Sequence, residues 1–433
     1  MLPRAIVVFV CFLFAGGVPV ATFGVPIVLP GSPAPSTSET PFETKLRAGH
    51  EALNKNELSK AAAAFGEAHK LDPKALSPLF GLAEVARLKK DGKGAESWLR
   101  KALSIAPDSA QVHQAWGRYH WSARNLPEAE AAFKRAISLD PNLVAAYVDL
   151  GGIYMEVPRK PGQAAQAYRK ALTLQPDVAD ARYGLGLALA LQGQAVEAAA
   201  ELEQAAKLMP GNPLPLQALG RLHVNQGKLN NAVDAFTRAL QARSDFLPAR
   251  IDRGDVYSVQ GNMEKAIADY LEVVKTQPKN AHAQYKLGFA YHGGNKPAEA
   301  EQAYRAAIAA DPKYAPAYNN LAWLLVQRRQ KLDDALRFAK KAVALAPEAA
   351  QFQDTLGTVY LARGEPDQAI TPLQKAAASK PPQAEFYFRL GLAHDKKGNR
   401  KEAVDAYKKA LAIDGNFPQS ENARKRLERL SGS

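Results

Sequence analysis

A period of 34 residues runs through most of this chain and limits what the chain can fold into. We number each copy from place 1 to place 34, with Pro312 at place 32. Such a repeat excludes a single globular core, because each short copy buries its apolar side only against neighbouring copies. Place 32 recurs every 34 residues, with two steps of 35, as Pro73, Pro107, Pro141, Pro176, Pro210, Ser244, Pro278, Pro312, Pro347, Pro381 and Gly415. Place 20 is alanine in all eleven copies: Ala61, Ala95, Ala129, Ala164, Ala198, Ala232, Ala266, Ala300, Ala335, Ala369 and Ala403.

The copy Ala281–Tyr314 shows what one repeat folds into. Leu287 and Tyr291 are four residues apart and share one side of a helix. Pro297 suits the first turn of a second helix with the same amphipathic spacing. Pro312 ends that helix, because the residue before proline is driven out of the α region. Each copy is therefore predicted to be a helical hairpin.

Small residues at fixed places predict close packing between these helices. Glycine occupies place 8 in nine copies, and alanine occupies place 27 in ten. A second set of glycines stands just past the first helix, at place 15, where a left-handed residue commonly ends a helix. These glycines are Gly193, Gly227, Gly261, Gly364 and Gly398.

The period and the pattern of small and large residues closely resemble the tetratricopeptide repeat (TPR) family. The resemblance covers residues 42–417 and implies an all-α fold, a right-handed superhelical solenoid of eleven TPR helical hairpins. Arg253 replaces the usual leucine, and Ala339 replaces a leucine or aromatic residue, so we expect altered packing there. Residues 418–433 contain the charged segment Pro418–Leu430, which predicts a C-terminal capping helix followed by a short tail.

The first 41 residues differ from the repeats. Residues 1–29 contain one charge, Arg4, and residues 5–29 are free of charge over a length that exceeds the about 20 residues needed to span a bilayer. This pattern predicts either a cleaved signal peptide or a retained membrane anchor, and the sequence leaves both open. Residues 30–41 have the proline, serine and threonine content of an extended, disordered linker. We therefore expect an extracytoplasmic solenoid, periplasmic or secreted, or one tethered through residues 5–29.

The formal charge of +13 raises the question of a nucleic-acid partner. Much of the excess stands at places 25 and 26, between the core places 24 and 27 of the second helix, and this position predicts a solvated helix face. We therefore do not expect nucleic acid as the partner, and a basic adaptor for anionic lipid or nucleic acid is kept as an alternative. The residues are Arg100, Lys101, Lys134, Arg135, Arg169, Lys170, Lys340, Lys341, Lys408 and Lys409.

The sequence offers no arrangement typical of catalysis, metal binding or cofactor binding. Cys11 is the only cysteine, which excludes an intrachain disulfide and a cysteine-based metal site. His282 and His292 share one expected helix but lie about 15 Å apart along its axis, too far to ligate one metal ion. The sequence contains neither an HExxH motif nor a P-loop. We expect no enzyme activity and no cofactor.

The resemblance also implies where a partner binds, because places 2, 5, 9 and 12 of the first helices line the concave surface of TPR proteins. No copy pairs lysine at place 5 with asparagine at place 9, as the chaperone-binding members do to hold a terminal carboxylate. Adjacent copies instead carry rings and amides that fit an extended peptide, since rings bury area and amides bond to its backbone. The alternative is packing between neighbouring first helices. The candidate partner-binding residues are Tyr285, Phe289, Asn319, Asn320 and Trp323.

These observations predict a non-catalytic scaffold that binds a peptide or protein partner in its concave groove. The charge-free N-terminal run and the repeats together resemble exported or envelope-type bacterial TPR proteins, which implies a role in envelope assembly or secretion. A self-assembling structural subunit is the second hypothesis, because the ends of a solenoid can stack on one another.

Overall fold

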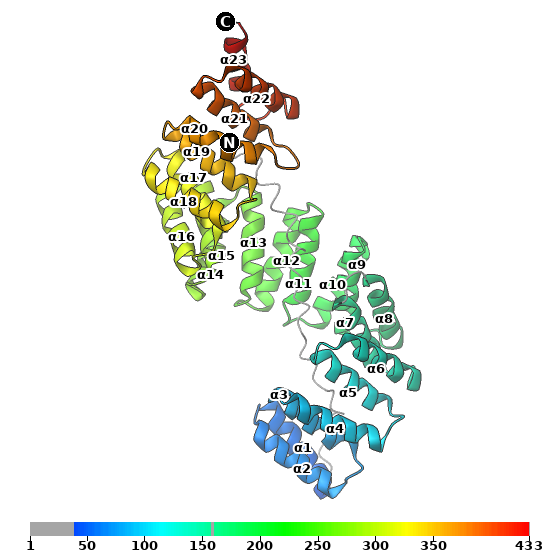
Figure 1. Cartoon of the computed structure of the whole chain (residues 1–433). Helices are drawn as coiled ribbons and strands as arrows, with labels where there is room; N and C mark the ends of the chain where they lie inside the picture. The colour runs from blue at the N-terminus through cyan, green and yellow to red at the C-terminus, as the bar shows by residue number, and fades with distance from the viewer. Residues whose placement is uncertain (1–38, 157–159, 433) are drawn as a thin grey trace. The chain divides into compact units, whose positions relative to one another are not determined.

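The computed structural model describes residues 39–156 and 160–432 and contains 23 α-helices and no β-strand in those ranges (Figure 1). The predicted all-helical solenoid of hairpins is confirmed. The expected signal peptide or anchor, most of the expected linker and part of the longer turn at residues 157–162 lie outside the described residues. The chain divides between α11 and α12 into two compact units, here called the first unit and the second unit.

In the first unit, each helix packs on the next, and the first helices of successive hairpins also touch, as in the pairs α1 and α3, α5 and α7, and α7 and α9. The helices are α1 (Pro41–Asn54), α2 (Leu58–Leu71), α3 (Leu76–Leu88), α4 (Gly92–Ile105), α5 (Ala110–Ser122), α6 (Leu126–Leu139), α7 (Val144–Glu156), α8 (Pro161–Leu174), α9 (Ala179–Leu191), α10 (Ala195–Leu208) and α11 (Leu214–Asn225).

From α13 onward the second unit repeats this arrangement, with contacts between α15 and α17, between α17 and α19, and between α19 and α21. The helices are α12 (Leu229–Ala242), α13 (Leu247–Val259), α14 (Met263–Thr276), α15 (Ala281–Gly293), α16 (Pro297–Ala310), α17 (Ala315–Gln327), α18 (Leu332–Leu345), α19 (Ala350–Ala362), α20 (Pro366–Ala377), α21 (Ala384–Lys397), α22 (Arg400–Ile413) and α23 (Ser420–Ser431).

Close approach of the two helices in a hairpin explains the small residues. A Cβ atom added to Gly288 would lie 2.7 Å from the ring of Tyr304, and one added to Gly117 would lie 2.6 Å from the ring of Phe133. Both glycines stand at place 8 and both rings at place 24 of the same copy. The alanine at place 20 is at most 1% exposed in every copy. The predicted packing of small residues is confirmed.

The turn at place 15 adopts the left-handed conformation in every copy that is described there. The five predicted glycines have φ between 72° and 88°, which confirms their capping role. Other residues adopt the same conformation without a glycine, at a steric cost. They are Asn56, Lys90, Arg124, Asn295 and Arg329, with φ between 49° and 61°.

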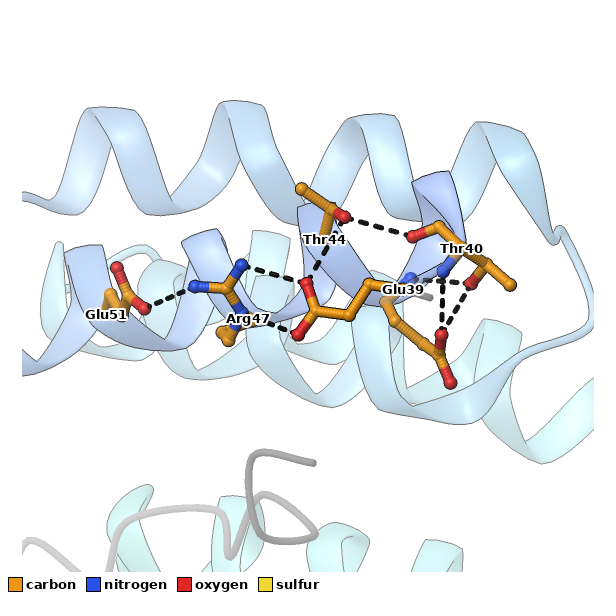
Figure 2. Close-up of polar contacts among 6 residues, drawn as sticks. Glu39, Thr40, Thr44, Arg47 and Glu51 are labelled. Carbon is orange, nitrogen blue, oxygen red and sulfur yellow. Dashed lines mark hydrogen bonds and ion pairs between the residues drawn. The ribbon is translucent and has the colours of Figure 1, made fainter. Parts of the chain in front are cut away.

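Helix α1 begins at Pro41, the last residue of the expected linker and one residue before the expected start of the repeats. Thr40 caps it, since the Thr40 hydroxyl accepts from the Glu43 amide at 3.2 Å and Glu43 Oε2 accepts from the Thr40 amide at 2.9 Å. Glu39 is also ordered, because both of its carboxylate oxygens accept from Arg47, at 3.1 and 2.9 Å (Figure 2). This capping box, with proline in the first turn, is a start signal that the linker composition concealed.

The two departures from the repeat pattern have local causes. Arg253 forms two hydrogen bonds with Asp269, at 2.8 and 2.7 Å, and one with Thr237 at 2.9 Å. An ion pair on the hairpin therefore replaces the usual leucine contact. Ala339 is fully buried, and the neighbouring Phe338, 8% exposed, supplies the ring that this copy lacks at place 24.

The C-terminal helix α23 covers the end of the second unit, one to two residues offset from the predicted segment. It packs on α22, and two of its arginines bind Asp395 on α21. Arg426 Nη1 lies 2.8 Å from that carboxylate, and Arg429 Nη2 lies 2.6 Å from it. The basic residues at places 25 and 26 are exposed in all ten cases, which confirms the solvated face.

Candidate functional site

The candidate residues lie on two neighbouring first helices of the second unit, α15 and α17. We call the surface of α15, α17, α19 and α21 that carries places 2, 5, 6 and 9 the first-helix face. Tyr285 and Phe289 stand one turn apart on α15, and Asn319, Asn320 and Trp323 stand on α17. The contact between α15 and α17 brings the two sets together.

Tyr285 is buried among other aromatic residues. It is 7% exposed, and its ring centroid lies 6.0 Å from that of Tyr304 and 5.4 Å from that of Tyr314. Its hydroxyl accepts from Asn320 Nδ2 at 3.2 Å. Burial raises the pKa of Tyr285 to about 12, so the phenol is neutral and hydrogen bonded at any ordinary pH. Tyr285 therefore packs on α16 of its own hairpin, on the turn before α17 and, through Asn320, on α17.

The two adjacent amides form a short chain of hydrogen bonds that ends in an unused acceptor. Asn319 Nδ2 donates to Asn320 Oδ1 at 3.2 Å, and Asn320 in turn donates to Tyr285. Asn319 Oδ1 is buried and has no hydrogen-bond partner among the described residues. A buried acceptor without a donor is destabilising by about 1–3 kcal/mol, and a bound N–H group would remove that cost.

Trp323 is half-buried and contacts a charged pair that sequence reasoning left out of the site. The guanidinium carbon of Arg389 lies 5.5 Å from the Trp323 ring centroid. Arg389 Nη1 lies 3.1 Å from both carboxylate oxygens of Asp354. The contact therefore joins α17, α19 and α21. The sequence signal for this pair is an acidic residue at place 5 of one copy, Asp354, and a basic residue at place 6 of the next copy, Arg389.

Asp354 is an ionisable group in an apolar setting. Burial raises its pKa to about 6, Arg389 opposes the rise, and Glu385 adds to it. The single ion pair with Arg389 thus does not offset the loss of water around the carboxylate.

Phe289 is half-buried and makes no ring contact with another described aromatic residue. The structure therefore links Tyr285, Asn319 and Asn320 through hydrogen bonds, places Trp323 with Arg389 and Asp354, and leaves Phe289 outside both groups. A third polar contact lies beside Tyr285, where Lys286 Nζ is 3.0 Å from Asp255.

The described residues contain no group of three histidine, cysteine, aspartate or glutamate side chains placed to hold a metal ion. In the same ranges, every helix is too short or too polar to cross a bilayer.

Comparison with known protein families assigns the repeats. A tetratricopeptide repeat model matches residues 46–110, 115–156, 158–213, 218–281, 251–315 and 355–421, and a second tetratricopeptide repeat model matches residues 303–337. The chain belongs to the tetratricopeptide repeat family. Repeats of this family generally serve as non-catalytic scaffolds that bind other proteins or peptides.

Several curated proteins resemble the chain over part of their length. Tetratricopeptide repeat protein 6 of Homo sapiens is 24% identical over 218 residues, which cover 49% of this chain and 41% of that protein. Cellulose synthase operon protein C of Xanthomonas axonopodis pv. citri is 28% identical over 324 residues, 68% of this chain and 21% of that protein. Protein O-mannosyl-transferase TMTC3 of Homo sapiens is 23% identical over 262 residues, 56% of this chain and 29% of that protein. The chain spans less than half the length of each.

Solved structures of the same repeat class align at modest similarity. The Cut9–Hcn1 hetero-tetramer of the APC/C aligns with a TM-score of 0.47 at 14% identity, over 90% of this chain and 96% of that one. MamA aligns with a TM-score of 0.34 at 33% identity, over 37% of this chain and 92% of MamA.

Proposed function

We propose that the chain is a non-catalytic scaffold that binds an extended peptide or protein segment on the first-helix face of α15 and α17. The observation that carries this proposal is the buried Asn319 Oδ1, which lacks a donor on a surface flanked by the half-buried Phe289 and Trp323. Asn319 as a residue is half-buried, so a rotation of its side chain would bring this acceptor to the backbone N–H groups of an extended segment. Its side chains would cover the two rings, which supply contact area at low cost in conformational entropy.

Tyr285 and Asn320 act in this proposal by holding Asn319 in place. Asn320 bonds to both residues, and Tyr285 is fixed by the rings around it. A polar group positioned by packed neighbours binds its ligand with less ordering cost than a free side chain. Binding energy is therefore expected from Asn319, Phe289 and Trp323, and stability from Tyr285.

The experiment compares capture of partners with stability of the fold. Trp323→Ala, Phe289→Ala and Asn319→Ala are each measured for urea unfolding and for capture of proteins from the extract of the source cells. If the rings are binding hot spots, truncation of one weakens binding by at least about 2 kcal/mol. Trp116, a half-buried ring on α5 of the first unit, provides the control variant Trp116→Ala. Reduced stability with unchanged capture would assign Phe289 and Trp323 to packing and overturn the proposal.

We further propose that the scaffold works outside the cytoplasm, in envelope assembly or secretion. The support is the charge-free run of residues 5–29, the linker composition of residues 30–41 and the likeness to cellulose synthase operon protein C. The full chain fused to a reporter that is active only outside the cytoplasm tests this. A silent reporter with normal expression would reject it, and fractionation separates a cleaved signal from a retained anchor.

A further inference from the structure

The pair of Asp354 and Arg389 is incompletely bonded for a buried charge. Arg389 carries five N–H donors, and only Nη1 has a partner among the described residues, the Asp354 carboxylate at 3.1 Å. The Asp354 side chain is 8% exposed and accepts from no other described residue, although a carboxylate can accept several bonds. Donor and acceptor capacity thus remain unused on both sides of the contact.

The charges around Trp323 favour a further cation. Glu385 lies one turn before Arg389 on α21 and forms no ion pair with a described residue. Burial is the main cause of the raised pKa of Asp354, and the charge of Glu385 makes a smaller contribution in the same direction. Two carboxylates and one guanidinium therefore lie on this part of the first-helix face, where the guanidinium contacts the Trp323 ring. An anionic group of a ligand would be repelled by both carboxylates. A cationic group would be attracted by them and by the face of the indole.

Given the proposed peptide binding on this face, we infer that Trp323, Asp354 and Glu385 form a subsite for a positively charged side chain, arginine or lysine, of the bound segment. Arg389 lies in this subsite while no segment is bound. The inference rests on the proposed function and names the chemistry of the partner at one position.

Replacement of Arg389 by a cation of the bound segment leaves the net charge of the subsite unchanged. The incoming group would stack on Trp323 and donate to the Asp354 carboxylate, with Glu385 as a second acceptor. Arg389 has a long stem, and its side chain is already 19% exposed, so the released guanidinium can remain hydrated at the surface. The weak hold on Arg389 by a single nitrogen makes it a displaceable occupant.

The test uses peptides selected for binding to the full-length chain. Random dodecapeptides displayed on phage are selected on the intact protein, and those that no longer bind Trp323→Ala are synthesised with a fluorescein label. Each basic residue of a peptide is then replaced by glutamine. We expect one such replacement to weaken binding about tenfold, equivalent to about 1.4 kcal/mol.

Variants of the protein sharpen the result. Glu385→Gln and Asp354→Asn should each weaken the selected peptides several-fold, and Arg389→Gln, which removes the resident cation, should tighten them several-fold. Glu402→Gln, at an exposed acid of α22, removes the same charge from the same unit and should leave binding unchanged. Because Asp354→Asn leaves Arg389 without its partner and can disturb folding, Glu385→Gln alone carries the conclusion.

The outcomes separate the two proposals. Peptides that need Trp323 but tolerate loss of every basic residue would overturn the cation subsite and leave peptide binding on this face intact. An absence of any peptide that depends on Trp323 or Asn319 would overturn the proposed function and the subsite with it. A preference for acidic residues would show that Arg389 itself is the recognition group and would overturn the inference.

Discussion

Two charged pairs between neighbouring first helices, one in each unit, differ in how fully they are bonded. In the first unit, Asp149 on α7 accepts from Arg118 Nε at 2.7 Å, from Arg118 Nη2 at 3.0 Å and from Gln114 Nε2 at 2.8 Å. In the second unit, Asp354 is held by one nitrogen of Arg389 at 3.1 Å.

The difference separates a pair whose polar groups are bonded within the fold from a pair that leaves donors and acceptors unused. A buried ion pair is tolerated when additional hydrogen bonds satisfy its remaining polar groups. Arg118 and Asp149 meet that condition, since both are at most 7% exposed and Gln114 adds a third donor. Arg389 does not, and it lies against a half-buried tryptophan. Similar places in the repeat therefore hold a closed contact in one unit and an open one in the other.

The largest effect is expected from breaking the closed pair. Arg118→Met should destabilise the protein by about 3–5 kcal/mol, because it leaves Asp149 buried without its charge partner. Arg389→Met also leaves a buried carboxylate without its charge partner, but it removes one hydrogen-bonding nitrogen instead of two, so we expect a smaller loss of about 2 kcal/mol. Urea unfolding followed by circular dichroism measures the loss in unfolding free energy of each variant. Hydrogen exchange then shows whether the loss is local to α5 and α7 or to α19 and α21. Equal losses of unfolding free energy in Arg118→Met and Arg389→Met would show that the two pairs contribute equally to stability and would contradict the proposed difference.

Packing inside the hairpins should not differ between the units. Ala129 on α6 and Ala300 on α16 are both fully buried at place 20. Ala129→Leu and Ala300→Leu should each cost about 1–3 kcal/mol, because the added atoms overpack the hairpin. Lys341→Leu, at an exposed place of α18, should change stability by less than about 0.5 kcal/mol. Thermal unfolding of all three variants tests this, and an effect confined to one unit would mean that the units differ in core packing as well.

The repeat period predicts almost everything that depends on one hairpin. The small residues at places 8 and 20 and the glycines at place 15 follow from contacts within one copy, which recur with the period. The sequence shows that Arg253 breaks the repeat pattern, but it does not show that Asp269 is its partner. This ion pair occurs in one copy only, so the period cannot predict it.

The candidate site was predicted less well, because its contacts run between copies. Tyr285 is covered by Tyr314, a turn residue at place 34, where the other aromatic residues of the repeats are Phe246 and Phe417. The contact of Arg389 with Trp323 reaches from the eleventh copy to the ninth. Such distances depend on how strongly successive hairpins curve, and the period does not encode that.

The pH dependence of stability probes the open pair directly. The pKa of Asp354 is about 6 in the folded chain, above its usual value of 3.8, and the charged groups that set it are Arg389 and Glu385. Between these two values the folded chain binds more protons than the unfolded chain, so stability falls as pH rises from about 4 to about 6. We expect a change on the order of 1 kcal/mol that is absent in Asp354→Asn. Unfolding free energies of both proteins across this range check it, and parallel curves would contradict the raised pKa.

The smallest expected effect concerns the turns at place 15, where each unit contains both glycine and other residues in the left-handed conformation. In the first unit, Lys90 and Arg124 have φ of 60° and 61° at place 15, whereas Gly261 has φ of 76° at the same place of the second unit. A left-handed conformation destabilises an L-residue by about 1–2 kcal/mol. Glycine avoids this steric cost, but it loses more conformational entropy on folding, so the net gain in stability is smaller. Lys90→Gly and Arg124→Gly should therefore each stabilise the protein by about 0.5–1 kcal/mol in urea unfolding. The control is Lys89→Gly, next to Lys90 but with φ of −76°, which should instead cost about 0.5 kcal/mol. The same sign of change at Lys89 and Lys90 would show that backbone strain at place 15 does not limit the first unit.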